Sequence, residues 1–504
     1  MFELLENFEK RLDYSKISVI IDNNLFILGH LSAIMDETKK KGVSKGLHNW
    51  CFMVKKGFLT GLLLFGIFFG AGNLIFPPAL GVDSGTNFWP AILGFCLSGV
   101  GLAIITLLVG TLTNGGYKHE MDLKFSPWFS LGFLVLLYLT IGPLFAIPRT
   151  ATVSFEVGLT PLVGHSQLVL FIFTLIYFLA AFALAFRPNN ILNSVGKILT
   201  PLFALLILLL VTIGALKYGH ETSSVANAAY TASAFGSGIL AGYNTLDALA
   251  SVAFCLVAIE TLKQFGFKSK QEYLSTIWVV GIVTSLAFSI LYIGLGFLGN
   301  KFHIPADVLA DPNVNKGAYV LAQASYSLFG PFGRIFLSLM VVLTCFTTTV
   351  GLIVSVSEFF DKHFSFANYK VFAVAFTIIG FLIANLGLNT VIQFSVPVLT
   401  LLYPIVIVMV IIILINKWLP LSKKGMSVTI GLVSFVSLLE VLAGLIKSQF
   451  LSNIVNAIPF HALSMGWLVP TVIGLVIALI LPDKQLGQAF NLSRFQAEAN
   501  EELS

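Results

Sequence analysis

Charged residues are scarce in this chain. Asp, Glu, Lys and Arg make up 11% of its 504 residues, whereas the apolar set AVILMFWYC makes up 57%. An average soluble domain holds about 25% charged residues, so a chain with so few cannot cover a water-facing surface. The scarcity excludes a soluble domain and indicates an integral membrane protein. The net charge of +5 is dispersed, and no basic cluster argues for a nucleic-acid partner.

Cysteine is also rare, and its four copies carry no metal or redox signature. Cys51, Cys96, Cys255 and Cys345 show neither a CxxC pair nor Cys/His spacing, so we expect neither a disulfide framework nor a zinc site. The chain also lacks a GxSxG nucleophile motif. We therefore expect a protein that is not an enzyme and that uses no cofactor.

Long apolar runs dominate the chain. A stretch of about 20 apolar residues crosses the hydrocarbon core of a bilayer as a helix, and about twelve such stretches follow one another between Leu59 and Leu481. Lys and Arg gather in every second loop between them, and such an excess marks cytoplasmic loops. The sequence therefore predicts an all-α, multi-pass protein of the cell membrane, in contact with lipid, with both termini in the cytoplasm.

The two ends of the chain differ from this apolar body. Residues 1–52 are polar and mixed in charge, without the apolar core and cleavage site of a signal peptide. Met53 opens MVKKGFLTGLLLFG, a positively charged lead into the first span. We expect residues 1–52 to be an upstream extension that arises from a mis-called start and is not native, with the natural start at Met53; the alternative is a short amphipathic helix on the membrane surface. Residues 485–504 are expected to form a cytoplasmic tail.

The first span is interrupted at its centre. Within GFLTGLLLFGIFFGAGNLIFPPALG, the apolar run is broken by Gly70, Ala71, Gly72 and Asn73. Unpaired backbone groups in hydrocarbon cost several kcal/mol, so irregular backbone at this depth is tolerated only where it is buried in protein or lines a cavity. The break therefore predicts a ligand site; the alternative is a glycine hinge that lets helices pack closely.

A second interrupted span occurs five spans later. In GILAGYNTLDALASVAFCL the break falls on Gly242, Tyr243, Asn244, Thr245 and Asp247. An odd number of helices per repeat inverts the second copy, so two breaks in corresponding positions meet at the centre of an inverted repeat. A carboxylate inside a span is costly and usually faces a cavity or a partner. The alternative is that Asp247 caps the second half-helix at its edge.

The eighth span carries two adjacent hydroxyls, Thr347 and Thr348, in CFTTTVGLIVSVSEFF. Hydroxyl and carbonyl oxygens are the ligands that a hard cation prefers. These two threonines, with carbonyls of the first span, are therefore candidate cation ligands. The alternative is that each hydroxyl bonds back to its own helix.

A deep cation occurs in the third span, IGPLFAIPRTATVSFEVG. Arg149 lies far enough into this span to need a partner, and Glu156, seven residues later on the same helical face, is a candidate. The alternative is an arginine near the span end that reaches the interface.

Four segments, FFGAGNLIFPPALG, IGPLFAIPRTATVSFE, GYNTLDALAS and FTTTVGL, resemble in order and spacing the signatures of the bacterial branched-chain amino acid:cation symporter (LIVCS) family. The resemblance implies a leucine-transporter-like fold, in which five-helix repeats over about 57–217 and 236–415 precede two further helices over about 426–482, within a transporter domain at 53–484. It also implies import of leucine, isoleucine and valine through the bacterial cell membrane by Na⁺ symport with alternating access, without an obligate protein partner.

The resemblance also assigns roles to individual residues. The backbone N–H groups of Ala71, Gly72 and Asn73 fall where this fold binds the substrate carboxylate, and the segment from Gly242 to Asp247 would close over the substrate side chain. Sodium would be held by carbonyl oxygens of Gly66 and Phe69 and by the hydroxyls of Thr347 and Thr348. Three alternatives stay open: an H⁺-coupled transporter of other apolar amino acids, a gated channel, and a sensor that binds an amino acid without carrying it.

Overall fold

The computed structural model describes residues 45–113, 116–164, 166–186, 191–263, 267, 269–311, 314–446, 448–488 and 490–491. Of the predicted N-terminal extension, residues 1–44 lie outside the described residues, and helix α3 (Lys45–Phe68) includes the rest of it. The predicted cytoplasmic tail at 485–504 is described at 485–488 and 490–491. The boundary between extension and transporter domain therefore stays a prediction.

The first half of the described chain is helical. Its α-helices are α3, α4 (Ala71–Ser84), α5 (Phe88–Cys96), α6 (Leu102–Thr111), α7 (Gly116–Lys124), α8 (Pro127–Leu139), α9 (Ala146–Val153), α10 (Thr160–Val163), α11 (Gln167–Ala185) and α12 (Ile191–Tyr218). Irregular turns join several of them, namely the 3₁₀ turn η1 (Gly85–Asn87) and the π-helical segments η2 (Leu97–Gly101), η3 (Thr140–Leu144) and η4 (Ser154–Leu159).

The second half of the described chain is also mainly helical. Its helices are α13 (Ala228–Ala232), α14 (Ala234–Tyr243), α15 (Asp247–Lys263), α16 (Lys270–Lys301), α17 (Ala306–Ala310), α18 (Lys316–His363), α19 (Tyr369–Ala384), α20 (Leu388–Ile415), α21 (Lys423–Ile446), α22 (Gln449–Asn456), the 3₁₀ turn η5 (His461–Leu463) and α23 (Leu468–Ile480). Two short strands, β1 (Leu421–Ser422) and β2 (Lys484–Gln485), pair antiparallel. Helix α18 is kinked at Gly330, where φ is +66° before Pro331.

Many of these helices are long and apolar enough to cross a membrane. Within the described residues, seven continuous helical segments meet that criterion, and the bent pair α14 and α15 makes an eighth. Shorter apolar helices at Leu202–Tyr218, Tyr369–Ala384 and Leu468–Ile480 coincide with further predicted spans. The all-α, multi-pass architecture is confirmed, and the number of twelve spans stays a prediction.

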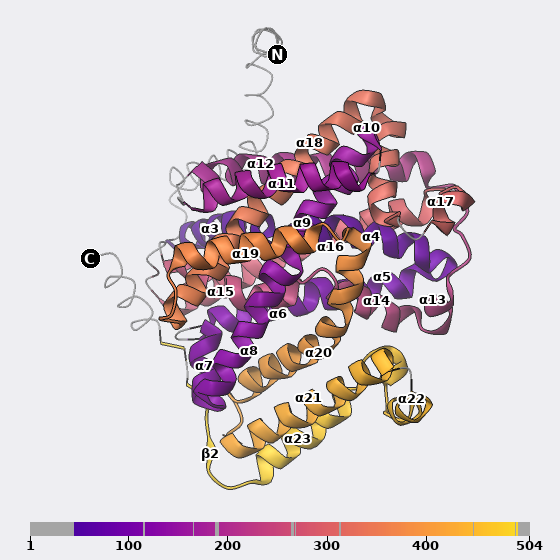
Figure 1. Cartoon of the computed structure of the whole chain (residues 1–504). Coiled ribbons are helices and arrows are strands. Elements are labelled where there is room, and N and C mark those ends of the chain that lie inside the picture. The colour runs from indigo at the N-terminus through magenta and orange to yellow at the C-terminus, as the bar shows by residue number, and fades with distance from the viewer. Residues whose placement is uncertain are drawn as a thin grey trace.

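The helices form one large group and one smaller pair. Helix α16 packs along α3 and α4, α14 packs on α5, and α15 packs on α6, while α18 contacts α4, α9 and η4. Helices α21 and α23 pack against each other, and α21 also contacts α20; Figure 1 shows this pair at the bottom of the view. The two broken helices are thus enclosed by the larger group.

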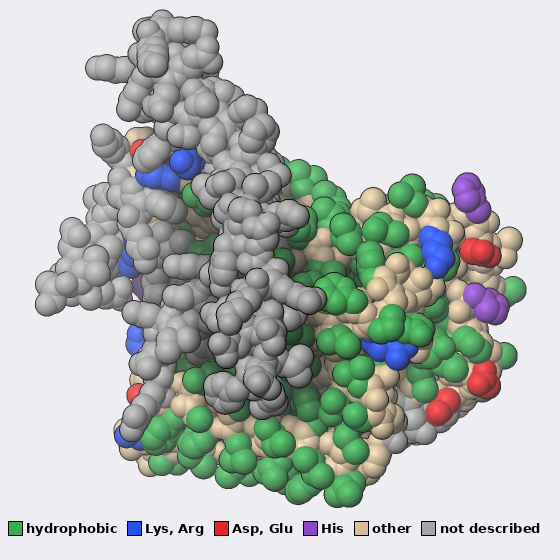
Figure 2. Space-filling model, turned by 90° about the horizontal axis from the view of Figure 1, so that it is seen from above, with side chains coloured by type: hydrophobic (Ala, Val, Ile, Leu, Met, Phe, Trp, Pro, Cys, Tyr) green, Lys and Arg blue, Asp and Glu red, His purple; other side chains and the backbone are tan. Residues whose placement is uncertain are grey.

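Large apolar side chains cover much of the outside. Trp89, Trp128, Trp278 and Trp418 are each more than 60% exposed, and Figure 2 shows apolar side chains across the uncovered part of one face, with charged and histidine side chains towards its edges. Exposed apolar surface of this extent marks an interaction surface. For a multi-pass protein, lipid is the solvent that such a surface requires.

A polar cluster joins the segment after α23 to the rest of the molecule. The Asn416 side chain donates to the carbonyl oxygen of Gln485 at 2.8 Å and accepts from Lys124 Nζ at 2.7 Å. The Gly487 N–H donates to the Asn416 carbonyl at 2.8 Å. Further on, the Phe490 ring stacks on Tyr273 near the start of α16, with centroids 4.6 Å apart. The final segment therefore bridges the end of α20 and the start of α16.

Glycines set the distance between each broken helix and a neighbouring helix. A Cβ atom on Gly299 of α16 would overlap the carbonyl oxygen of Pro78 in α4, and one on Gly238 of α14 would overlap that of Ala91 in α5. Backbone therefore meets backbone at both crossings. Small residues let membrane helices approach this closely, and the contacts hold the second half of the first span against the seventh.

We predict that Gly299→Val disrupts the packing of α4 on α16, because the added side chain meets backbone atoms that cannot rotate away. Overpacking costs about 1–3 kcal/mol even in adaptable cores, so the melting temperature in detergent should fall clearly. Gly351→Val is the matched control, since a Cβ there meets nothing within 4 Å. Equal melting temperatures for the two variants would contradict the close approach.

Candidate functional site

The first break is shorter than the sequence predicted. Helix α3 ends at Phe68 and α4 begins at Ala71, so the irregular residues are Phe69 and Gly70. Ala71, Gly72 and Asn73, predicted as part of the interruption, are instead the first turn of α4. The helix restarts early because the Asn73 side chain accepts a hydrogen bond from the Gly70 N–H at 2.9 Å, which closes the turn. The N–H groups of a first turn have no partner within the helix.

The second break covers Asn244, Thr245 and Leu246. Helix α14 ends at Tyr243 and α15 begins at Asp247, with a bend of 40° between them. Leu246 has φ +68°, a conformation that bulky residues rarely adopt and that persists only where the surroundings impose it. The predicted interruption from Gly242 to Asp247 therefore contains the observed break. Gly242, Tyr243 and Asp247, however, belong to the helices on either side of it.

The two breaks lie against each other. A Cβ atom on Gly72 would lie 3.3 Å from both the Cα and the carbonyl oxygen of Thr245, and 3.5 Å from the carbonyl oxygen of Asn244. Gly242 faces elsewhere: a Cβ there would overlap Ser98 Oγ, so this glycine permits close packing on η2. Thr245 Oγ1 donates to the Gly242 carbonyl at 2.8 Å. Gly72, Asn244 and Thr245 thus form the contact between the breaks.

A buried polar network ties the breaks to α16. The Asn73 amide donates to both Asp247 carboxylate oxygens at 2.9 Å, and Tyr292 OH donates to one of them at 2.6 Å. Asn73 also contacts the Tyr292 hydroxyl. Asp247 is 3% exposed, and these partners are neutral. Sequence reasoning missed Tyr292, because a single tyrosine inside an apolar span gives no signal of its own.

Arg149 reaches the second break rather than its predicted partner. Its Nη1 donates to the Asn244 carbonyl oxygen at 2.5 Å and its Nη2 to Ser395 Oγ at 2.9 Å. The side chain is 2% exposed, so it does not extend to the interface. The predicted pairing with Glu156 is wrong: Glu156 lies in the π-helical segment η4, whose wider turns mean that the residue seven positions after Arg149 no longer shares its helical face. The guanidinium is instead directed across the molecule towards α14 and α20.

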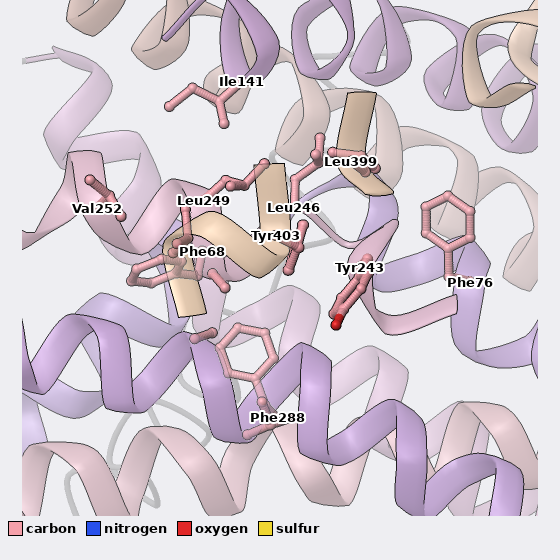
Figure 3. Packing of buried hydrophobic residues seen from close by; sticks show 14 of the residues in the cluster. Phe68, Phe76, Ile141, Tyr243, Leu246, Leu249, Val252, Phe288, Leu399 and Tyr403 are labelled. Carbon is pink, nitrogen blue, oxygen red and sulfur yellow. The ribbon is translucent and has the colours of Figure 1, made fainter. Parts of the chain in front are cut away.

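Apolar and aromatic side chains surround the second break. Figure 3 shows Leu246 close to Leu249 and Leu399, with Tyr243 and Tyr403 beside them. The rings of Tyr243 and Tyr403 stack with centroids 4.2 Å apart. The Tyr403 hydroxyl is buried and has no hydrogen-bond partner within the described residues. Tyr403 was not anticipated, since it lies in the tenth span, far from both breaks in the sequence.

Thr347 and Thr348, two of the four predicted cation ligands, lie on one face of α18. Thr347 Oγ1 and Thr348 Oγ1 both donate to the Thr344 carbonyl oxygen, at 2.9 and 3.0 Å, which is the back-bonding that the sequence left as an alternative. The Thr348 methyl group lies 3.7 Å from a Cβ built on Gly70, so this face meets the first break. The roles of Gly66, Phe69, Thr347 and Thr348 as cation ligands stay predictions.

Thr349 is directed away from this face. Its hydroxyl lies 2.5 Å from Thr150 Oγ1 and 2.8 Å from Tyr177 OH, and it is fully buried. Thr344 adds a buried hydroxyl without a partner within the described residues, one turn before Thr347. The described residues hold no cluster of three or more His, Cys, Asp or Glu side chains.

Two broken helices held side by side in a helical bundle are the hallmark of transporters with the leucine-transporter fold, and comparison with solved structures confirms this predicted fold. A manganese transporter of Eremococcus coleocola aligns with a TM-score of 0.54 at 13% identity, covering 86% of this chain and 97% of that chain. Mhp1, a nucleobase-cation-symport-1 family transporter in a closed conformation, aligns at 0.52 with 12% identity, covering 84% and 91%.

Sequence comparison defines the family. The family described as branched-chain amino acid transport protein matches residues 53–485. A protein of Staphylococcus haemolyticus, named as a branched-chain amino acid carrier protein, is 42% identical over 439 residues, which cover 84% of this chain and 97% of that protein. The chain therefore belongs to the branched-chain amino acid transport protein family, as the four segments predicted.

We predict that Gly72→Leu abolishes detectable binding of branched-chain amino acids, because its side chain must occupy the contact between the breaks, 3.3 Å from Thr245 backbone. Binding of radiolabelled leucine to purified protein is the measurement. Gly132→Leu is the matched control, since a Cβ there meets nothing within 4 Å. Near-normal binding by Gly72→Leu would show that the first break serves only as a packing hinge.

Proposed function

We propose that this protein imports leucine, isoleucine and valine into a bacterial cell by Na⁺ symport with alternating access. The observation that carries the proposal is the direct contact of the two breaks at Gly72 and Thr245. Family membership supports branched-chain amino acids as the substrate class. The loop distribution of Lys and Arg supports a membrane orientation with both termini in the cytoplasm.

The α-carboxylate is proposed to bind at the start of α4. The N–H groups of Ala71, Gly72 and Asn73 lack intrahelical partners, and the positive end of the helix dipole favours an anion there. The α-ammonium would be met by carbonyl oxygens at the ends of α3 and α14 and by the nearby Asp247 carboxylate. Asn73 links these two regions, since it donates to Asp247 from the first turn of α4.

The aliphatic side chain is proposed to bind among the apolar residues beside the second break. Leu246, Leu399 and the ring of Tyr243 lie there (Figure 3). Each CH₂ group removed from water contributes about 0.8 kcal/mol, so a branched side chain gains appreciably over alanine.

The coupling ion is proposed to bind between the first break and α18. Carbonyl oxygens of Gly66 and Phe69 would join the hydroxyls of Thr347 and Thr348, and the Thr344 carbonyl, to which both hydroxyls already bond, is a fifth candidate. A cation held there would fix the Phe69–Gly70 segment, from which α4 starts. Coupling then follows because ordering this segment favours substrate binding at the same helix end.

Alternating access would move one set of helices against another. Helices α3 to α6 and α14 to α16, which form spans one, two, six and seven, are joined by contacts such as those of α16 with α3 and α4, of α14 with α5 and of α15 with α6. They would rock as a unit against the rest, which includes α9, α18 and α19. The three alternative functions predict different behaviour. A gated channel would conduct without saturation, an H⁺-coupled carrier would respond to pH gradients, and a sensor would bind an amino acid without flux.

The decisive test is uptake of radiolabelled leucine into proteoliposomes under imposed gradients. We expect saturable uptake that follows an inward Na⁺ gradient, exchange of internal for external leucine, and competition by isoleucine and valine. Uptake driven by a pH gradient in the absence of Na⁺ would show that H⁺, and not Na⁺, is the coupling ion. Binding without flux, or flux without saturation, would overturn the carrier itself.

We predict that the double variant Thr347→Val/Thr348→Val raises the Na⁺ concentration for half-maximal uptake at least tenfold. It keeps side-chain volume and removes two oxygens that a hard cation cannot replace with methyl groups, and a loss of about 1.4 kcal/mol corresponds to tenfold in affinity. Leucine affinity at saturating Na⁺ should change much less. A wild-type Na⁺ dependence in this variant would show that the cation does not bind at Thr347 and Thr348.

Thr377→Val is the appropriate control for this double variant. The Thr377 hydroxyl is buried and bonds back to the Ala373 carbonyl in α19, so its loss tests a threonine of the same kind outside the site. Thr349→Val is unsuitable, because it breaks contacts with Thr150 and Tyr177 and reports on packing instead.

A further inference from the structure

We propose that Arg149 binds the α-carboxylate of the substrate and, with Asp247, makes the site selective for zwitterionic α-amino acids. The inference rests on the proposed transport function and adds a charged residue from the third span to the helix terminus at α4. It assigns a role to a side chain that the packing of the helices alone does not explain.

The guanidinium of Arg149 is a buried cation with neutral partners. Its contacts are the Asn244 carbonyl, the Ser395 hydroxyl and the face of the Phe76 ring, 5.1 Å from Cζ. Its Nε is buried and has no hydrogen-bond partner within the described residues. A charged side chain inside a membrane protein is costly unless it is paired, and such residues mark ligand pathways. One donor of this cation is therefore left for an anion.

The position of the guanidinium matches the proposed carboxylate site. Nη1 bonds to the Asn244 carbonyl oxygen, and that oxygen lies 3.5 Å from a Cβ built on Gly72. The guanidinium also lies over Phe76, one turn into α4. The first turn of α4 and the guanidinium of Arg149 thus approach the same region. A carboxylate there would receive a charge-assisted hydrogen bond in addition to the helix dipole.

A second isolated charge lies on the other side of the second break. The Asp247 carboxylate is held by Asn73 and Tyr292, which are neutral. The ring of Tyr403 stacks on the ring of Tyr243. The Tyr403 hydroxyl also has no hydrogen-bond partner within the described residues. Arg149 bonds to Asn244, and Asp247 follows three residues later, so opposite charges flank one short segment of backbone.

A free amino acid complements this arrangement, and its derivatives do not. The carboxylate of leucine would neutralise Arg149 while its ammonium neutralises Asp247. Leucinamide, which lacks the carboxylate, would leave the cation unpaired, and a buried unpaired charge is strongly unfavourable. The site should therefore prefer leucine to leucinamide, and Arg149 should be the origin of that preference.

The test is the Kd of leucine and of leucinamide, measured by thermal-shift titration of purified protein at saturating Na⁺, for the wild type and for Arg149→Gln. We expect Arg149→Gln to weaken leucine binding at least about a hundredfold, equivalent to about 2.7 kcal/mol, and to change leucinamide binding less than about threefold. Discrimination between the two ligands should shrink accordingly, leaving only the preference that the N-terminus of α4 has for a carboxylate.

Arg334→Gln is the matched control, because its guanidinium lies over the Tyr326 ring and donates to the Pro161 carbonyl, away from both breaks. It should keep the wild-type preference. Arg149→Lys keeps the positive charge and should lose about tenfold in leucine affinity with leucinamide unchanged; it decides the matter if Arg149→Gln does not fold.

Two results would overturn the inference. In one, Arg149→Gln and Arg149→Lys keep wild-type leucine affinity. In the other, leucine and leucinamide weaken by the same factor, which shows that Arg149 only holds the second break in shape through Asn244. Either result leaves leucine transport by the wild type in place, whereas a wild type that neither binds nor carries leucine would remove the proposed function first.

Discussion

A helix interrupted inside a membrane leaves backbone N–H and C=O groups that lipid cannot satisfy, and this molecule is organised around supplying them with partners. The first break is closed by the Asn73 side chain on the Gly70 N–H. The second is held by Arg149 on the Asn244 carbonyl. Both partners come from protein rather than lipid, so each break has to be enclosed by other helices. The glycine contacts between α4 and α16 and between α5 and α14 achieve that enclosure.

Charged side chains inside the spans are subject to the same constraint, because lipid cannot solvate them either. Few charged residues occur in the spans, and the two that lie at the breaks, Arg149 and Asp247, contact neutral groups. A site with separated, uncompensated charges is poised for a ligand that carries both signs. Under the proposed function, the apolar side chains beside Leu246 would contribute affinity for the aliphatic part of the substrate, and the two charges would contribute the requirement for a free amino acid.

The site also links two groups of helices that, under the proposed alternating access, would move relative to each other. Asn73, Asp247 and Tyr292 join α4, α15 and α16, which pack as one group. Arg149 and the threonine face of α18 belong to the other group and approach the breaks from outside. Substrate and cation would therefore lie at the boundary between the two groups. A ligand at such a boundary can favour one relative position over another only through differential affinity.

Composition, apolar run length and local motifs were enough to predict the membrane class, the all-α architecture, the location of both breaks and the family, because each of these features depends on residues that are close together in the chain. The sequence located Arg149 and Asp247 as unusual charges for the same reason. It could not determine their partners: in a regular helix Glu156 would share a face with Arg149, but the π-helical segment Ser154–Leu159 changes that register, and the guanidinium donates to Asn244 and Ser395. Tyr292, Tyr403 and the orientation of Thr349 likewise depended on the tertiary structure. Each is one polar residue in an apolar span, and only the packing of distant helices decides which of its neighbours it meets.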